Sequence, residues 1–266
     1  MVEKGCMMLF VISIIVAFTD NDSRKWGTKL NGIPVVPVEE AVNMQIDLFV
    51  LTSAPGKDAI TKQLISLGIS EKCISSEFID IQIESRIVFL KNLSEMQKKI
   101  DLDVQVAEAG VFEGDFAKYI NRYYPDRKCH LFDTFEGFVK KDLEKENGRS
   151  EAVTGDYSNT SVAMVMDKMP YKDNVIIHKG FFPESAYDVE GKFCFVNLDL
   201  DLYEPTYQGL IFFKDRMTKG GVILVHDYYA TNFKGPKDAV DKFLLENGKY
   251  NCFPIGDGIS MMICGF

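Results

Sequence analysis

Acidic residues directly follow three apolar segments of this 266-residue chain, and their placement predicts a metal site. Asp133, Asp199 and Asp227 each end such a segment, and Asp201 stands two positions after Asp199. Strands of an open α/β sheet bind ligands beyond their carboxyl ends, so these carboxylates are expected to face one crevice. Crowded carboxylates repel one another unless a cation binds between them. Their hard oxygen atoms suit Mg²⁺ or a similar divalent ion.

A second group of residues predicts a nucleoside site. Glu108, Gly110 and Gly114 form the pattern E-x-G-x-x-x-G, and Asp133 follows about twenty residues after these glycines. Glycines let the backbone pass close to a ligand. A carboxylate at the end of the second strand can accept hydrogen bonds from ribose hydroxyls.

The charge of this pattern narrows the choice of nucleoside. The dinucleotide fingerprint is G-x-G-x-x-G, and Glu108 stands where a pyrophosphate would be repelled. An acid there suits a ligand with a cationic, phosphate-free end, and S-adenosylmethionine carries an ammonium, a sulfonium and a ribose. We therefore expect Glu108, Gly110, Gly114 and Asp133 to bind this cofactor.

Alternating strands and helices must position these residues, and their order predicts a doubly wound, Rossmann-like α/β sheet. The predicted strands are the segment that leads to Glu108 and residues Cys129–Phe132, Asn174–His178, Lys192–Leu198 and Val222–Val225. Apolar residues at helical spacing predict helices at Phe116–Tyr124, Ser158–Met169, Tyr207–Met217 and Pro236–Glu246. We expect Ser158 or Asn159 to cap the second of these helices.

The polar excursion Val139–Asp156 has the length of an active-site lid. Tyr250–Pro254 and Ile259–Cys264 predict a C-terminal β-hairpin.

The chain is expected to contain a second, smaller α/β domain at its N-terminus. We assign residues 1–80 to this domain, residues 81–102 to a connecting helix, and residues 103–266 to the domain with both predicted sites. The apolar run Met7–Phe18 resembles a signal-peptide core, but it is too short to span a bilayer as a helix. We expect it to be a buried helix end that runs into a strand at Ile14–Phe18.

Composition excludes some classes of function. Thirty basic and thirty-nine acidic residues give a net charge of −9, which disfavours binding to nucleic acid or to an anionic membrane. The six cysteines are scattered without a C-x-x-C pair, so we expect free thiols, a reducing compartment and a cytoplasmic location.

Residues 100–266 carry an ordered set of motifs that resembles the macrocin O-methyltransferase family. The motifs are VAEAGVFEGDFA, LFDTFEGF, SNTSV, GFFPES, NLDLDLYEPT, KGGVILVHDYY and GPKDAVDKF. The resemblance implies a methyltransferase fold, S-adenosylmethionine as methyl donor, a divalent metal, and a sugar hydroxyl as acceptor.

The resemblance also implies roles for individual residues. Asp199 and Asp227 would be metal ligands, and Asp201 would be a ligand or the general base. Members of the family commonly have two adjacent acids where this chain has His226-Asp227. The metal would then bind more weakly or use His226 as a nitrogen ligand, or His226 would itself be the general base.

Other polar and aromatic residues near the predicted sites have structural alternatives. His130 lies inside a predicted strand and is expected to be a packed core histidine, and a structural role is also favoured for His178. Tyr203, Tyr228 and Tyr229 flank the acids and are candidates for lining a sugar pocket or for ordinary packing.

The N-terminal string AFTDNDSRKWGTKLNGIPVV resembles the Rossmann-like domain of polysaccharide-biosynthesis enzymes and sugar acyltransferases. Only sixteen residues precede it, and they lack the glycine-rich loop of that domain. We therefore expect this domain to be a truncated structural or oligomerising module, and the protein to be a homodimer.

Together the residues and the resemblance predict a metal-dependent O-methyltransferase that acts on a sugar hydroxyl of a glycan or glycosylated natural product. Two alternatives stay open at this point. A nicotinamide-dependent sugar oxidoreductase is disfavoured because no G-x-G-x-x-G is present. A non-catalytic subunit that binds S-adenosylmethionine is left open by the histidine at position 226.

Overall fold

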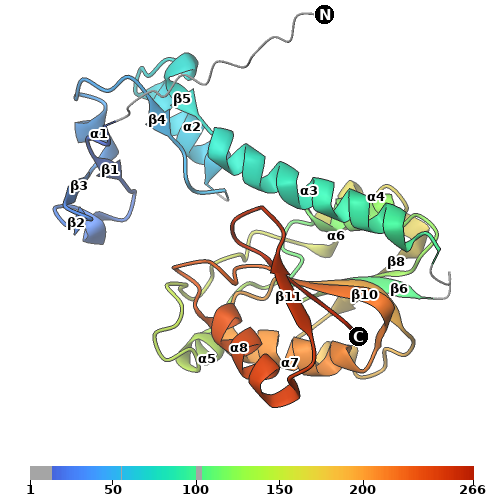
Figure 1. Cartoon of the computed structure of the whole chain (residues 1–266). Coiled ribbons are helices and arrows are strands. Elements are labelled where there is room, and N and C mark those ends of the chain that lie inside the picture. Colours follow the sequence, from blue (N-terminus) through green and yellow to red (C-terminus); the bar gives the residue numbers. More distant parts are fainter. Residues whose placement is uncertain (1–13, 55, 100–103) are drawn as a thin grey trace, which may run out of the picture. The chain divides into compact units, whose positions relative to one another are not determined.

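The computed structural model describes residues 14–54, 56–99 and 104–266. The chain divides into two compact units, Met1–Asp80 and Ile81–Phe266, and each is described by itself (Figure 1). In the described part of the chain no helix is both long and apolar enough to cross a membrane.

The first unit contains two small sheets and short helices. Strands β1 (Phe18–Thr19), β3 (Ile33–Val36) and β2 (Lys29–Leu30) form one sheet in that order, and β4 (Phe49–Val50) pairs in parallel with β5 (Ile74–Ser75). Helices α1 (Val38–Ala41) and α2 (Lys57–Ser66) complete the unit together with the start of α3 (Glu77–Gln97). A small core, which includes Val36, Phe49 and Leu64, holds these elements together.

The expectation for the apolar run is wrong where it can be compared. The strand predicted at Ile14–Phe18 begins only at Phe18, and Ile14 is 83% exposed rather than buried. The register places Phe18 opposite Val35, so Pro34, which has no N–H, would lie opposite the residue before Phe18. Pro34 therefore ends the hydrogen-bonded pairing of β1 with β3. Residues 7–13 of the run lie outside the described residues.

The second unit is built on a seven-stranded sheet in the order β11-β12-β10-β9-β6-β7-β8. The strands are β6 (Gln105–Ala109), β7 (Cys129–Asp133), β8 (Val175–Lys179), β9 (Phe193–Leu198), β10 (Met217–Val225), β11 (Asn251–Pro254) and β12 (Met261–Cys264). The first five are parallel, and β12 runs antiparallel to both of its neighbours. The predicted doubly wound sheet and its closing hairpin are therefore confirmed.

Helices cover both faces of this sheet (Figure 1). They are the second part of α3, α4 (Ala117–Tyr123), α6 (Val162–Lys168), α7 (Tyr203–Lys214) and α8 (Gly235–Asn247), and the short helix α5 (Lys140–Glu144) lies in the connection between β7 and α6. One buried cluster joins the sheet to α3, α4 and α6 through Leu90, Ile120 and Val165. The other joins it to α7 and α8 through residues such as Phe213 and Phe243.

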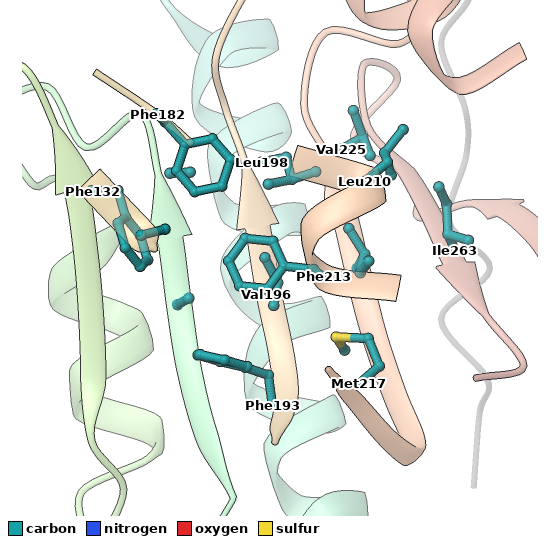
Figure 2. Packing of buried hydrophobic residues seen from close by; sticks show 14 of the residues in the cluster. Phe132, Phe182, Phe193, Val196, Leu198, Leu210, Phe213, Met217, Val225 and Ile263 are labelled. Atoms are coloured by element: carbon teal, nitrogen blue, oxygen red, sulfur yellow. The ribbon is translucent and has the colours of Figure 1, made fainter. Parts of the chain in front are cut away.

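Aromatic rings fill the second cluster (Figure 2). The Phe213 ring stacks on Phe182 with centroids 5.9 Å apart, and it meets the edges of Phe132 and Phe193. Rings of this size bury a large apolar area and favour such stacked and edge-to-face contacts. The resulting rigid layer fixes the strands β7 and β9, whose carboxyl ends carry predicted site residues.

Helices α6 and α7 begin at other residues than predicted. The cap of α6 is Ser161, whose side chain accepts a hydrogen bond from the Met164 amide, rather than Ser158 or Asn159. Helix α7 begins at Tyr203 rather than at Tyr207. Its first amide is satisfied by Glu146, a residue distant in sequence, which no local pattern predicts.

Candidate active site

The predicted site residues gather beyond the carboxyl ends of β6, β7, β9 and β10. Strand order reverses between β6 and β9, which is where open α/β sheets bind their ligands. The loop that starts with Gly110 follows β6, and Asp199 follows β9. His226 and Asp227 follow β10. The fold therefore brings the glycine loop and the acids to one edge of the sheet.

Asp133 organises the glycine loop. Its Oδ2 accepts hydrogen bonds from the amides of Val111 at 2.7 Å and Phe112 at 2.8 Å. Its Oδ1 accepts one from the amide of Phe135 at 2.7 Å. The carboxylate is thus largely occupied by the backbone in this structure, and its predicted contact with ribose stays a prediction.

The two glycines are required by the packing of the protein itself. Gly110 has φ of 83°, and a Cβ atom there would lie 1.7 Å from the carbonyl oxygen of Asp199. Gly114 has φ of 80°, and its Cβ would lie 3.1 Å from Val165. Gly110 therefore allows β6 and β9 to end side by side, which brings Glu108 close to Asp199.

Glu108 is a buried acid with an unused oxygen. It is 1% exposed, and its Oε1 accepts a hydrogen bond from Asn197 Nδ2 at 2.7 Å. Its Oε2 is buried and has no partner among the described residues. Burial raises the pKa of Glu108 to about 8, against the opposing charge of Arg86. A buried carboxyl with a free oxygen suits a cationic ligand, as expected for the ammonium of S-adenosylmethionine.

Asp199, His226 and Asp227 form a group that could hold a metal ion. One donor atom from each lies within 4.8 Å of the others. His226 Nδ1 lies 3.0 Å from Asp199 Oδ1 and 2.9 Å from Asp227 Oδ2, although neither contact has the angles of a hydrogen bond. An ion placed among these atoms would have two oxygen ligands and one nitrogen ligand.

Charge in this group is balanced by two cations. Burial disfavours the imidazolium, but the charges of Asp199 and Asp227 outweigh it and raise the pKa of His226 to about 9. Burial likewise opposes ionisation of Asp199, but His226 and Arg86 together lower its pKa. The histidine therefore supplies the positive charge that two carboxylates require.

Asp201 lies beside this group and is not one of its members among the described residues. Burial, followed by the charges of Asp227 and Asp199, raises the pKa of Asp201 well above its ordinary value. Asp201 and Asp227 have φ of 59° and 60°, a left-handed conformation that is uncommon outside glycine. Such conformations concentrate at functional sites. The predicted roles of Asp201 as ligand or base stay predictions.

Sequence reasoning missed Arg86, which lies on α3. Its Nη2 lies 3.0 Å from Asp199 Oδ2, and its side chain is only 12% exposed. The guanidinium lies 3.8 Å above the ring of Phe116, at the start of α4. The segment was interpreted as a plain connecting helix, and a contact between residues 113 positions apart leaves no local signal.

Tyr157 was also missed. Its ring meets Phe112 of the glycine loop at 5.1 Å and Phe138 at 5.4 Å, both edge to face. Burial and then the charges of the acid group, Asp201 first, raise its pKa above the usual range. Tyr157 therefore lies beside both the glycine loop and the acids, and it has φ of 60°.

Residues 139–156, which we call the strap, are attached to the start of α7 and to the segment that follows β10. Glu146 Oε1 accepts a hydrogen bond from the Tyr203 amide at 2.9 Å, and Arg149 pairs with Asp238 at 2.9 Å. Ser150 forms a bridge with Phe233. The predicted lid is thus held in place by contacts with α7 and α8 in this structure.

The other candidate residues have packing partners. Tyr203 stacks on Tyr207, and Tyr228 donates a hydrogen bond to Asp241 at 2.7 Å. Tyr229 is 45% exposed and meets Tyr228 edge to face.

The two histidines of β7 and β8 contact each other. His130 is buried, and its Nδ1 lies 2.8 Å from Nε2 of His178. Its Nε2 lies 2.6 Å from Gln105 Oε1. This agrees with the expected core role of His130 and the favoured structural role of His178.

A pocket of about 470 Å³ opens beyond β7 and β8. Its walls include Thr134 and Gly137 after β7, Gly180 and Phe181 after β8, and Val139 of the strap. The pocket therefore lies at the same edge of the sheet as the glycine loop and is formed by the two strands that follow β6 in sequence.

Comparisons with known proteins agree with this arrangement. The family model for macrocin-O-methyltransferase (TylF) matches residues 83–251, and a model described as C2185-like, N-terminal, matches residues 6–75. Comparison with curated protein sequences gives no match. Among solved structures, the O-methyltransferase NovP is similar at 19% identity and a TM-score of 0.54, over 67% of this chain and 78% of NovP. The calicheamicin methyltransferase CalS11 is similar at 17% identity and a TM-score of 0.57, over 80% of this chain and 94% of CalS11.

The sheet order, the glycine loop after β6 and these structural similarities define a Rossmann-like methyltransferase fold. The family model spans more than half of the chain, and the chain belongs to the macrocin-O-methyltransferase family. The protein is therefore an S-adenosylmethionine-dependent O-methyltransferase, and the oxidoreductase alternative is set aside.

Proposed function

We propose that this protein methylates a hydroxyl of a sugar, in a glycan or a glycosylated natural product, with the help of a divalent ion. The observation that carries the proposal is the convergence of Asp199, His226 and Asp227 next to the buried acid Glu108. The family and the similar structures support the acceptor class. The same CalS11 enzyme, in its apo form, is described as a TDP-rhamnose 3′-O-methyltransferase, with a TM-score of 0.50 and 18% identity.

The cofactor would lie across the carboxyl ends of β6, β7 and β8. The free Oε2 of Glu108 fits its ammonium, and the amides of the glycine loop are held in position by Asp133. The pocket bounded by Thr134 and Phe181 has room for the nucleoside end. Asp199, which follows the neighbouring strand β9, would connect this cofactor site to the acid group.

The donor set fits a divalent ion. Asp199 and Asp227 would supply oxygen atoms, and His226 would supply Nδ1 after losing the proton that now balances the carboxylates. Mg²⁺ prefers oxygen, whereas Mn²⁺ and other first-row metals also accept imidazole. A bound ion would lower the pKa of a coordinated sugar hydroxyl.

The remaining chemistry belongs to the residues of this chain. Asp201 would take the proton of the acceptor hydroxyl, and the alkoxide oxygen would then attack the methyl group in line with its leaving sulfur. Tyr157 and the strap would cover the reacting atoms from water.

We propose in addition that the first unit is a structural module that supports a homodimer. A cytoplasmic location is proposed as well, because the described cysteines Cys73, Cys129, Cys194, Cys252 and Cys264 are all free thiols.

Methyl transfer from labelled S-adenosylmethionine to a panel of nucleotide sugars and glycosides tests the proposal, with and without a chelator. Asp227→Asn should abolish transfer, because it removes an anionic metal ligand, yet leave cofactor affinity within about threefold, since Glu108 and the glycine loop remain. The exposed Asp188→Asn is the matched control and should retain full activity. Full activity after exhaustive chelation would remove the metal from the mechanism. Cofactor binding without transfer to any sugar would contradict the proposed acceptor class.

A further inference from the structure

The Arg86 side chain is largely buried and forms an ion pair with Asp199, and it also has a hydrogen-bond donor without a partner among the described residues. Its Nη2 lies 3.0 Å from Asp199 Oδ2, and its guanidinium carbon lies 3.8 Å from the centroid of the Phe116 ring. Its Nε is buried and has no hydrogen-bond partner among the described residues. A buried donor without a partner costs free energy, so this atom is expected to find a partner when the site is filled.

Glu108, which lies near Arg86, has a buried hydrogen-bond acceptor without a partner among the described residues, where Arg86 has a donor without one. Its Oε2 is a buried acceptor without a partner, and the charge of Arg86 is near enough to lower the pKa of Glu108 against the effect of burial. The structure nevertheless records no ion pair between Arg86 and Glu108 within its described residues. An unpaired donor of Arg86 and an unpaired acceptor of the Glu108 carboxyl group thus both belong to side chains that lie near Asp199.

We infer that Arg86 binds the α-carboxylate of S-adenosylmethionine, while Glu108 binds its ammonium. The amino-acid end of the cofactor is a zwitterion, and an arginine and a glutamate held apart from each other match its two charges. Guanidinium and carboxylate form strong charge-assisted hydrogen bonds. This inference rests on the cofactor site of the proposed function and assigns a role to a helix that precedes the sheet.

Arg86 is well suited to this task because its position is fixed before the ligand arrives. Phe116 covers one face of the guanidinium, and Asp199 holds one of its nitrogen atoms. A pre-organised arginine loses little side-chain entropy on binding. Because Asp199 is also a proposed metal ligand, Arg86 would join the cofactor site to the acid group.

The test compares ligands that differ only at the amino-acid end. Calorimetry in the presence of a chelator would measure binding of S-adenosylmethionine, of its decarboxylated form, and of methylthioadenosine to the full-length protein. Arg86→Met keeps the apolar stem and removes the charge. It should weaken S-adenosylmethionine binding by about 10- to 100-fold, as expected for losing hydrogen bonds to a charged group. Binding of the decarboxylated form should change by less than about threefold, since it has no carboxylate to lose.

Two further variants complete the comparison. Arg86→Lys keeps the charge without the fork of donors, so S-adenosylmethionine should bind between wild type and Arg86→Met. Glu108→Gln should weaken binding of S-adenosylmethionine and of its decarboxylated form alike, because both carry the ammonium. It should leave methylthioadenosine unaffected.

Equal losses for all three ligands in Arg86→Met would overturn the inference, because they would indicate that Arg86 only supports the fold through Asp199. Unchanged S-adenosylmethionine binding would overturn it as well. These ratios depend on neither metal nor acceptor. A wild-type protein that binds the cofactor but methylates no sugar would therefore contradict the proposed acceptor alone.

Discussion

At the scale of single residues, the site is organised around buried charges that lack a full set of partners. Glu108 has a free oxygen, Arg86 has a free Nε, and His226 Nδ1 lies between two carboxylates without hydrogen-bond angles to either. Such groups are costly in an interior unless a ligand completes them. Their concentration beside the glycine loop is the strongest physical sign that this edge of the sheet binds small charged molecules.

Substitutions of His226 distinguish two possible roles of this residue, metal ligand and general base. His226→Asp restores two adjacent acids and replaces a cation with an anion, so it should tighten Mg²⁺ binding, measured by calorimetry on the full-length protein. If His226 is only a metal ligand, activity at saturating Mg²⁺ should persist. If it is the general base, the same change should lower the rate by about 10²- to 10⁴-fold.

His226→Gln provides the matched comparison, since it removes the imidazole without adding charge. It should not tighten Mg²⁺ binding. A variant His226→Asp that binds Mg²⁺ no better than His226→Gln would contradict the assignment of this position to the metal site.

At the scale of elements, the sequence predicted the strands that leave a local pattern of residues. It missed the features that depend on contacts between residues far apart in the chain. Apolar runs followed by glycine or an acid located the five parallel strands of the main sheet, because buried strands leave that pattern in any context. The start of α7 was missed because its first amide is satisfied by Glu146 across 57 positions. For the same reason Arg86 was missed, and the hydrogen bonds that Asp133 accepts from three backbone amides were not predicted.

The packing of β6 against β9 also determines the geometry of the site, because Gly110 after β6 lies against the backbone of Asp199 after β9. Gly110→Ala would place a Cβ atom 1.7 Å from the carbonyl oxygen of Asp199, so the two strand ends must move apart. We expect a loss of about 2–4 kcal/mol in unfolding free energy and weaker cofactor binding, measured by urea unfolding and calorimetry.

Gly258→Ala is the control for this prediction. Gly258 has φ of 77°, close to the 83° of Gly110, but nothing lies within 4 Å of the position that its Cβ would take. This change should cost only about 1 kcal/mol, the strain of the left-handed conformation, and leave cofactor binding unchanged. Equal effects of the two substitutions would show that the contact with Asp199 is unimportant.

At the scale of the whole molecule, the division into a small first unit and a larger second unit matches two separate family models. The boundary falls inside α3, so this helix does more than connect two parts. Its second half belongs to the catalytic unit: Leu90 is fully buried there, and Gln97 donates hydrogen bonds to carbonyl oxygens of Cys194 and Gly220.

Two truncated chains would test this view of α3. A chain that begins at Glu77 keeps the whole helix, so it should bind S-adenosylmethionine within about threefold of the full protein. A chain that begins at Val104 loses Arg86, the packing of Leu90 and the hydrogen bonds of Gln97. Deleting one buried leucine side chain alone costs about 2–5 kcal/mol, so this shorter chain should be unstable and should not bind the cofactor. Calorimetry and thermal unfolding of both chains give the comparison. If the chain from Val104 were as stable as the chain from Glu77 and bound the cofactor equally well, α3 would be a connector after all, as the sequence alone had indicated.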